Sequence, residues 1–154
     1  FIIGGWGYGF FDGQQTGAVW LIFGKPSGWN MDTPMSEAGA SFIGEGKNSW
    51  TGFSVAGVGD VNQDGYDDFL IGAPRNDEVG TYAGQVYLIL GKESGWSLNT
   101  PLANADASIL ADNPYDLAGY ALSGAGDVNG DGFNDFLLTT YGSQSSGDSE
   151  YGKV

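Results

Sequence analysis

The feature that most constrains this chain is an internal repeat with a constant offset of 67 residues. Residues 17–74 align with residues 84–141 without an insertion or deletion, and 25 of the 58 paired positions are identical. Such a period indicates supersecondary units that stack on one another, because one unit alone cannot bury its apolar surface. The fold must therefore be assembled from copies of one unit.

Each repeat contains four short segments that are rich in β-branched and aromatic residues and bounded by turn-forming residues, which is typical of strands. The predicted strands are Val19–Phe23, Ala40–Ile43, Phe53–Ala56, Asp68–Ile71, Val86–Leu90, Ala107–Leu110, Tyr120–Ser123 and Asp135–Leu138. Only Ser36–Ala40 and Leu102–Ala107 could hold a helical turn, and neither keeps a 3.6-residue period. Glycine supplies 28 of the 154 residues with no collagen period, which indicates many tight turns. The sequence therefore predicts an all-β fold.

Four strands per unit predict tandem four-stranded blades of a β-propeller. The predicted units are residues 1–16 (the end of a preceding blade), 17–83 (repeat 1), 84–151 (repeat 2) and 152–154 (the start of a following blade). Because these ends fall inside units, we expect the chain to be a piece of a longer repeat array. Two repeats cannot close a ring, so an open, solenoid-like or filamentous stack of blades is the alternative.

Composition excludes several classes of chemistry. The chain has no His and no Cys, which rules out Ser-His-Asp and Cys-His nucleophiles, thiolate or imidazole zinc sites and disulfides. A formal net charge of −14 argues against nucleic acid and anionic membrane surfaces as partners. No apolar run approaches the ~18 residues of a membrane span, so membrane insertion is not expected. Oxygen ligands remain for any metal chemistry.

Those oxygen ligands concentrate in one loop that occurs twice. Asp60-Val61-Asn62-Gln63-Asp64-Gly65-Tyr66-Asp67-Asp68 is repeated as Asp127-Val128-Asn129-Gly130-Asp131-Gly132-Phe133-Asn134-Asp135, with oxygen side chains at positions 1, 3, 5 and 9. Calcium takes six to eight such ligands, and a Gly at position 6 permits a sharp turn that leaves the carbonyl of position 7 free to ligate. The sequence therefore predicts two Ca²⁺ sites, formed by Asp60, Asn62, Asp64, Asp68 and the Tyr66 carbonyl, and by Asp127, Asn129, Asp131, Asp135 and the Phe133 carbonyl.

Two other readings of these loops are open. The closing acid falls at position 9 rather than 12 and no helix flanks the loop, so it is not an EF-hand. A turn rich in Asp and Asn with solvated acids is the simplest alternative, and Mg²⁺ is a less suitable ion than Ca²⁺. The three predicted carboxylate ligands of each loop would repel one another without a cation, which favours the calcium interpretation.

The first acidic loop (residues 60–68) and its flanks resemble the FG-GAP repeat of integrin alpha chains. The residues that carry this resemblance are GDVNQDGYDDFLIGAP and the preceding Gly52-Phe53-Ser54-Val55. The whole chain is similar to bacterial secreted proteins with tandem FG-GAP units. The resemblance implies a typically seven-bladed propeller with calcium on the loop between adjacent strands. The second repeat departs from it, because Gly72-Ala73-Pro74 becomes Thr139-Thr140-Tyr141 and Phe53 becomes Tyr120. These changes put the local turn and packing in doubt, not the ligands.

The most specific function predicted is an extracellular or cell-surface calcium-binding module with a structural, adhesive or interaction role. Its expected partners are neighbouring blades or identical subunits, together with a protein or carbohydrate surface ligand. A subunit of an extracellular filament or surface assembly is the second reading. A propeller-fold hydrolase or lyase is the third, since paired carboxylates suffice for glycoside hydrolysis, but no pair outside the loops stands out and we do not expect an enzyme.

Aromatic residues outside the loops leave two questions open. Trp29 and Trp96 occur at the same repeat position, which favours blade packing over sugar stacking. A second group, formed by Trp6, Tyr8, Phe10 and Phe11, is interleaved with glycine and is either a contact surface or a loop packed on a neighbour.

Overall fold

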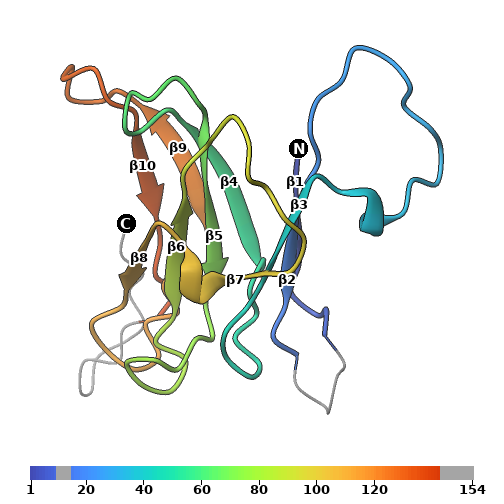
Figure 1. The fold of residues 1–154 in the computed structure, drawn as a ribbon. Helices are drawn as coiled ribbons and strands as arrows, with labels where there is room; N and C mark the ends of the chain where they lie inside the picture. Colours follow the sequence, from blue (N-terminus) through green and yellow to red (C-terminus); the bar gives the residue numbers. More distant parts are fainter. Residues whose placement is uncertain (10–14, 143–154) are drawn as a thin grey trace.

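The computed structural model describes residues 1–9 and 15–142, which form three β-sheets packed in a row (Figure 1). The sheet orders are β1-β2-β3-β7, β4-β5-β6-β8 and β10-β9. The strands are β1 (Ile2–Gly5), β2 (Ala18–Leu21), β3 (Ala40–Ile43), β4 (Ser54–Gly59), β5 (Asp68–Ala73), β6 (Gln85–Ile89), β7 (Thr100–Pro101), β8 (Ala107–Leu110), β9 (Leu122–Gly126) and β10 (Asp135–Leu138). The predicted all-β fold is confirmed.

Each of the eight predicted strands overlaps an observed one, and the two candidate helical turns are short 3-10 helices at Met35–Glu37 and Leu102–Asn104. The sequence did not predict β7, which has only two residues. Nothing in residues 1–9 and 15–142 forms a helix long and apolar enough to cross a membrane.

Strand β5 forms the centre of the molecule, and all six of its residues are buried. Its side chains alternate between two faces, as in any strand. Phe69 and Ile71 pack toward the first sheet with Phe42, whereas Leu70 packs toward the third sheet with Leu122. Because both faces of β5 are covered, its sequence is a continuous apolar run rather than an alternating one. Each large apolar side chain buried in this way stabilises the fold by about 1.5–3 kcal/mol.

The sheets and the sequence repeats are out of phase. The second sheet takes β4 and β5 from repeat 1 and β6 and β8 from repeat 2. Likewise β1 pairs antiparallel with β2, so the strand within residues 1–16 shares a sheet with the start of repeat 1 and does not lie in a separate preceding blade. The blade boundaries therefore differ from those drawn at residues 16 and 83, because a blade begins with β4 or β9 and ends with β3 or β8. Residues 152–154 lie outside the described residues.

The third sheet is shorter than its counterpart in the second. Strand β10 has four residues, whereas β5 has six and includes Gly72 and Ala73. The repeat counterparts of these residues, Thr139 and Thr140, lie beyond the end of β10. The departure of the second repeat from the Gly-Ala-Pro signature thus coincides with a shorter strand.

A segment that we call the second Trp loop (residues 91–101) joins the first two sheets. It leaves the second sheet after β6 and pairs in parallel with β3 through β7. The Asn99 N–H donates to Ser41 Oγ at 2.7 Å, and the Trp96 ring lies 6.4 Å from the Phe42 ring. Hydrogen bonds and apolar burial therefore connect one sheet to the next at this loop.

The aromatic residues near the N-terminus are half exposed and also packed. Trp6 is 46% exposed and its ring lies 5.2 Å from the ring of Trp50, while Tyr8 packs edge-on against Trp20 at 4.8 Å. These contacts favour the interpretation of a loop packed on its neighbours. Phe10 and Phe11 lie outside the described residues.

Candidate metal centre

The two acidic loops lie at the same end of the molecule. The first acidic loop (residues 60–68) connects β4 to β5, and the second (residues 127–135) connects β9 to β10 (Figure 1). The loops are neighbours, since the Asn134 side chain lies against Gly59 and the Gln63 side chain lies near Gly132. Packing of the second and third sheets therefore places both predicted sites next to each other.

In the first acidic loop, the oxygens of positions 1 and 3 meet at one N–H group. Asp60 Oδ1 and Asn62 Oδ1 both accept hydrogen bonds from the Asp64 N–H, at 3.1 and 3.0 Å. Asp60 Oδ2 accepts from the Gly65 N–H at 2.8 Å, and Asp64 Oδ1 accepts from the Tyr66 N–H at 2.9 Å. Gly65 has a φ of 91°, a conformation that strongly favours glycine. The loop curls because its own side chains accept hydrogen bonds from its backbone.

The second acidic loop repeats these contacts closely. Asp127 Oδ1 and Asn129 Oδ1 accept from the Asp131 N–H at 3.1 and 2.9 Å. Asp127 Oδ2 accepts from the Gly132 N–H at 2.8 Å, and Asp131 Oδ1 accepts from the Phe133 N–H at 2.9 Å. Equal distances in two copies with different neighbours indicate that the nine residues determine this conformation themselves.

The side chains at position 7, Tyr66 and Phe133, are 40% and 42% exposed. Phe133 has no side-chain oxygen, so a ligand from position 7 of the second acidic loop could come only from the backbone carbonyl, and the Tyr66 and Phe133 carbonyls remain predicted ligands.

Position 9 is the point at which the loops differ. Asp68 is 1% exposed, and its carboxylate accepts hydrogen bonds from the Val61 N–H at 2.8 Å and from the Gly91 N–H at 2.7 Å. Asp135 is half buried and accepts from the Val128 N–H at 2.8 Å. Asp68 thus connects its own loop to the first residue of the second Trp loop. The loop spacing contains no signal for this contact, since Gly91 is 23 residues away in sequence.

The acids at position 1 of both loops have lowered pKa values. Desolvation is the largest single influence on Asp60 and works to raise its pKa, but hydrogen bonds from four backbone N–H groups, those of Gly65, Asp64, Gln63 and Asn62, together outweigh it and hold the pKa below its usual value. For Asp127 the hydrogen bond from the Gly132 N–H is the largest influence, and the pKa is again lowered. Both carboxylates are therefore stabilised in the charged form that a cation requires.

The loop residues fit a calcium ion in their donor chemistry. The oxygens of positions 1, 3 and 5 are gathered, because Asn62 Nδ2 also donates to Asp64 Oδ2 at 2.9 Å. Position 9 is directed at backbone N–H groups, and no group of three or more Asp, Glu, His or Cys side chains suited to a metal comes together in the described part of the chain. Each carboxylate oxygen that accepts one hydrogen bond keeps a second lone pair. Hard oxygen donors of this kind are those that calcium prefers.

Comparison with known proteins identifies the repeat. The FG-GAP repeat profile matches residues 51–89 and 118–154, so each matched segment contains one acidic loop. The chain belongs to the FG-GAP repeat family. The resemblance stated from the sequence is thereby confirmed, and the three sheets are blades of an FG-GAP propeller.

Relatives of this FG-GAP chain include integrin alpha chains. Integrin alpha-6 of Homo sapiens is 36% identical over 127 residues, which cover 82% of this chain and 10% of the relative. Integrin alpha-IIb of Homo sapiens is 33% identical over 159 residues, covering 92% of this chain and 15% of the relative. Integrin alpha-PS5 of Drosophila melanogaster is 35% identical over 96 residues, covering 61% and 9%. The chain thus spans about a tenth of the length of the curated relatives it matches.

Proposed function

We propose that this chain is an extracellular, non-enzymatic FG-GAP interaction module whose two acidic loops bind calcium. Its partner is a protein or carbohydrate surface at the cell exterior. The similarity to integrin alpha chains supports an adhesive or interaction role and a location outside the cell. We propose no catalytic role, for two reasons. The related integrin alpha chains support an interaction module, and many of the acids lie in the two acidic loops, where their carboxylates accept hydrogen bonds from the loop backbone.

The observation that carries the calcium proposal is the agreement between the two loops. In both loops the oxygens of positions 1 and 3 accept from the same N–H and the position 3 amide donates to the position 5 carboxylate, through hydrogen bonds whose lengths differ by no more than 0.1 Å between the copies. Each loop brings three predicted carboxylate ligands into nine residues, and their mutual repulsion favours a cation. Asp60, Asn62, Asp64, the Tyr66 carbonyl and Asp68 would hold one ion, and their repeat counterparts Asp127, Asn129, Asp131, the Phe133 carbonyl and Asp135 the other.

A bound calcium ion would supply positive charge and fix the conformation of the strand connection. In the first acidic loop this effect extends further, because Asp68 also accepts the Gly91 N–H and so contacts the start of the second Trp loop. Ordering the loop therefore stabilises the joint between the first and second sheets as well as the hairpin itself. The role of calcium is structural in this proposal.

The test compares unfolding of the full chain in excess EDTA and in calcium. At a calcium concentration 100 times the dissociation constant, each site should add about 2.7 kcal/mol to the free energy of unfolding. We expect Asp64→Ala and Asp131→Ala each to remove one site, measured by calorimetric titration with calcium. Magnesium at the same concentration should stabilise the chain less, because it demands stricter octahedral geometry.

Asp67→Asn is the matched control. It removes one carboxylate from the first acidic loop at position 8, where the second loop already has Asn134, and it leaves all predicted ligands in place. Retention of two sites in Asp67→Asn, with one site lost in Asp64→Ala, supports specific ligation. Equal melting in EDTA and calcium would refute the proposal.

A further inference from the structure

We propose that Asn129 is a site of spontaneous deamidation, promoted by the hydrogen bonds of the second acidic loop and made possible by Gly130. The reaction closes a succinimide ring between the Asn129 side chain and the Gly130 backbone nitrogen. The inference concerns the metal-free chain and does not depend on calcium binding.

Two contacts around Asn129 correspond to events of ring closure. The attacking group, the Gly130 N–H, donates to Asp127 Oδ1 at 2.7 Å, so a carboxylate is in place to take its proton. The Asp131 N–H donates to Asn129 Oδ1 at 2.9 Å and would stabilise negative charge that develops on that oxygen. Asn129 Nδ2 donates to Asp131 Oδ2 at 2.9 Å, which holds the side-chain amide in place, and the proton that the leaving nitrogen needs comes from water.

The reaction needs only water. The Gly130 nitrogen bonds to Asn129 Cγ as its proton passes to Asp127. The Cγ–Nδ2 bond breaks as the leaving nitrogen takes up a proton from water and departs as ammonia, and Asp127 returns its proton to the solvent. Water then opens the ring at either carbonyl. The product is aspartate, which adds a fourth carboxylate to the loop, or isoaspartate, which lengthens the backbone by one bond before Asp131.

The first acidic loop is a built-in comparison. Asn62 is exposed like Asn129 and makes the same two contacts to Asp64, at 3.0 and 2.9 Å. The following residue is the difference. Gln63 has a φ of 61° and Gly130 a φ of 76°, so both backbones turn alike, but Gln63 carries a Cβ that crowds the attacking nitrogen. Residue 4 of the loop therefore decides which copy reacts.

The experiment incubates the full chain in excess EDTA at mildly alkaline pH and follows the peptides around residues 62 and 129 by mass spectrometry in ¹⁸O-labelled water. We expect conversion of Asn129, with one labelled oxygen per event and isoaspartate among the products, at least about tenfold faster than conversion of Asn62. Gly130→Gln should slow it to the rate of Asn62, Gln63→Gly should raise the rate at Asn62 to that of Asn129, and Asp127→Asn should slow conversion of Asn129 although the Asn-Gly sequence is unchanged.

Circular dichroism melting verifies that each variant is folded, and the left-handed Gln63 of the first loop shows that Gln is tolerated at this position. Equal rates at Asn62 and Asn129, or no product at Asn129, would overturn the proposal. A rate unaffected by Asp127→Asn, or one as fast in urea as in the folded chain, would overturn the role of the loop contacts.

Discussion

The Trp loops of the two repeats have the same local structure and different surroundings. We call residues 24–34 the first Trp loop, the counterpart of residues 91–101. The indole Nε1–H of Trp29 and of Trp96 donates to a Lys carbonyl four residues earlier, at 3.0 Å in both copies. The Lys Nζ lies over the Trp ring in both, 5.1 and 4.9 Å from its centroid. The short-range interactions are therefore the same.

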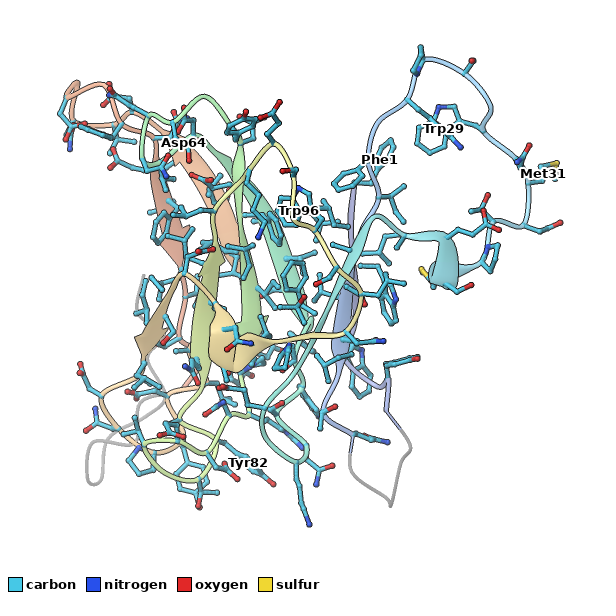
Figure 2. All side chains as sticks on the ribbon, viewed as in Figure 1. Phe1, Trp29, Met31, Asp64, Tyr82 and Trp96 are labelled. Carbon is cyan, nitrogen blue, oxygen red and sulfur yellow. The ribbon has the colours of Figure 1, made fainter. Side chains whose placement is uncertain are left out.

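The environments of the two rings are not the same. Trp96 lies in the body of the molecule, whereas Trp29 lies on a loop that extends away from the sheets, close to Phe1 (Figure 2). The Trp96 ring is 6.4 Å from the ring of Phe69, while Trp29 is 52% exposed. The helical turns that follow differ in the same way, since Leu102 is 1% exposed and its counterpart Met35 is 41% exposed.

This difference shows that a repeat can preserve a conformation without preserving its energetic role. The second Trp loop has the first sheet to pack on. Within the described residues, no sheet occupies the corresponding position beside the first Trp loop. The packing interpretation of the paired Trp residues is therefore confirmed for Trp96, and Trp29 has the same loop geometry without a sheet partner.

Trp96→Ala and Trp29→Ala should show the largest difference in stability between the two Trp loops. Loss of a large side chain packed between two sheets should lower the free energy of unfolding by about 3 kcal/mol, and Trp29→Ala by less than about 1 kcal/mol. Urea unfolding followed by circular dichroism in the same buffer measures both. Similar losses for the two variants would contradict the difference in their environments.

Ser41→Ala should have a smaller effect, at the hydrogen bond that secures the second Trp loop. Ser41 is 2% exposed and its Oγ accepts the Asn99 N–H, so removal of the hydroxyl should cost about 1–2 kcal/mol. The repeat counterpart Ser108 is exposed on β8, and Ser108→Ala should change stability by less than about 0.5 kcal/mol. A cost for Ser108→Ala equal to that of Ser41→Ala would show that the two strands are in equivalent surroundings after all.

The position 1 acids of the two loops should give the smallest difference between copies, because both accept hydrogen bonds of the same length from the backbone N–H groups of positions 5 and 6. The folded pKa values of Asp60 and Asp127 lie below the usual 3.8, so the unfolded chain binds more protons in acid. Their contribution to stability is present above pH 3.8 and is lost as the pH falls below it through the folded pKa. In EDTA, the free energy of unfolding should fall less steeply with decreasing pH in Asp60→Asn and in Asp127→Asn than in the unmodified chain, and by a similar amount in the two variants. Unequal changes in this slope would show that the loops are not equivalent.

Much of the fold was predictable because its signals are local. The strands at Ala40–Ile43 and Asp135–Leu138 match their predicted bounds, since turn-forming residues enclose short apolar segments. Strand β7 was not predictable, because Thr100–Pro101 has no strand pattern and pairs only because β3 lies beside it. For the same reason the blade boundaries could be assigned only from the observed strand pairing. The repeat alone does not say whether a strand pairs with the preceding or the following repeat.

The candidate site divides in the same way. Positions 1 to 7 of each acidic loop follow from residues that hydrogen-bond to their own backbone within five positions. The surroundings of Asp68 do not, since its partner Gly91 reaches it only when β5 and β6 pair.

The sequence by itself determined the repeat, the strands, the conformation of both acidic loops and the local geometry of both Trp loops, because each depends on backbone preferences and hydrogen bonds between residues close in the chain. Only the tertiary structure decided which strands share a sheet, which Trp packs against a neighbouring sheet and which closing acid is enclosed. These outcomes depend on contacts such as Ser41 with Asn99, 58 residues apart, which exist only once one sheet lies against another.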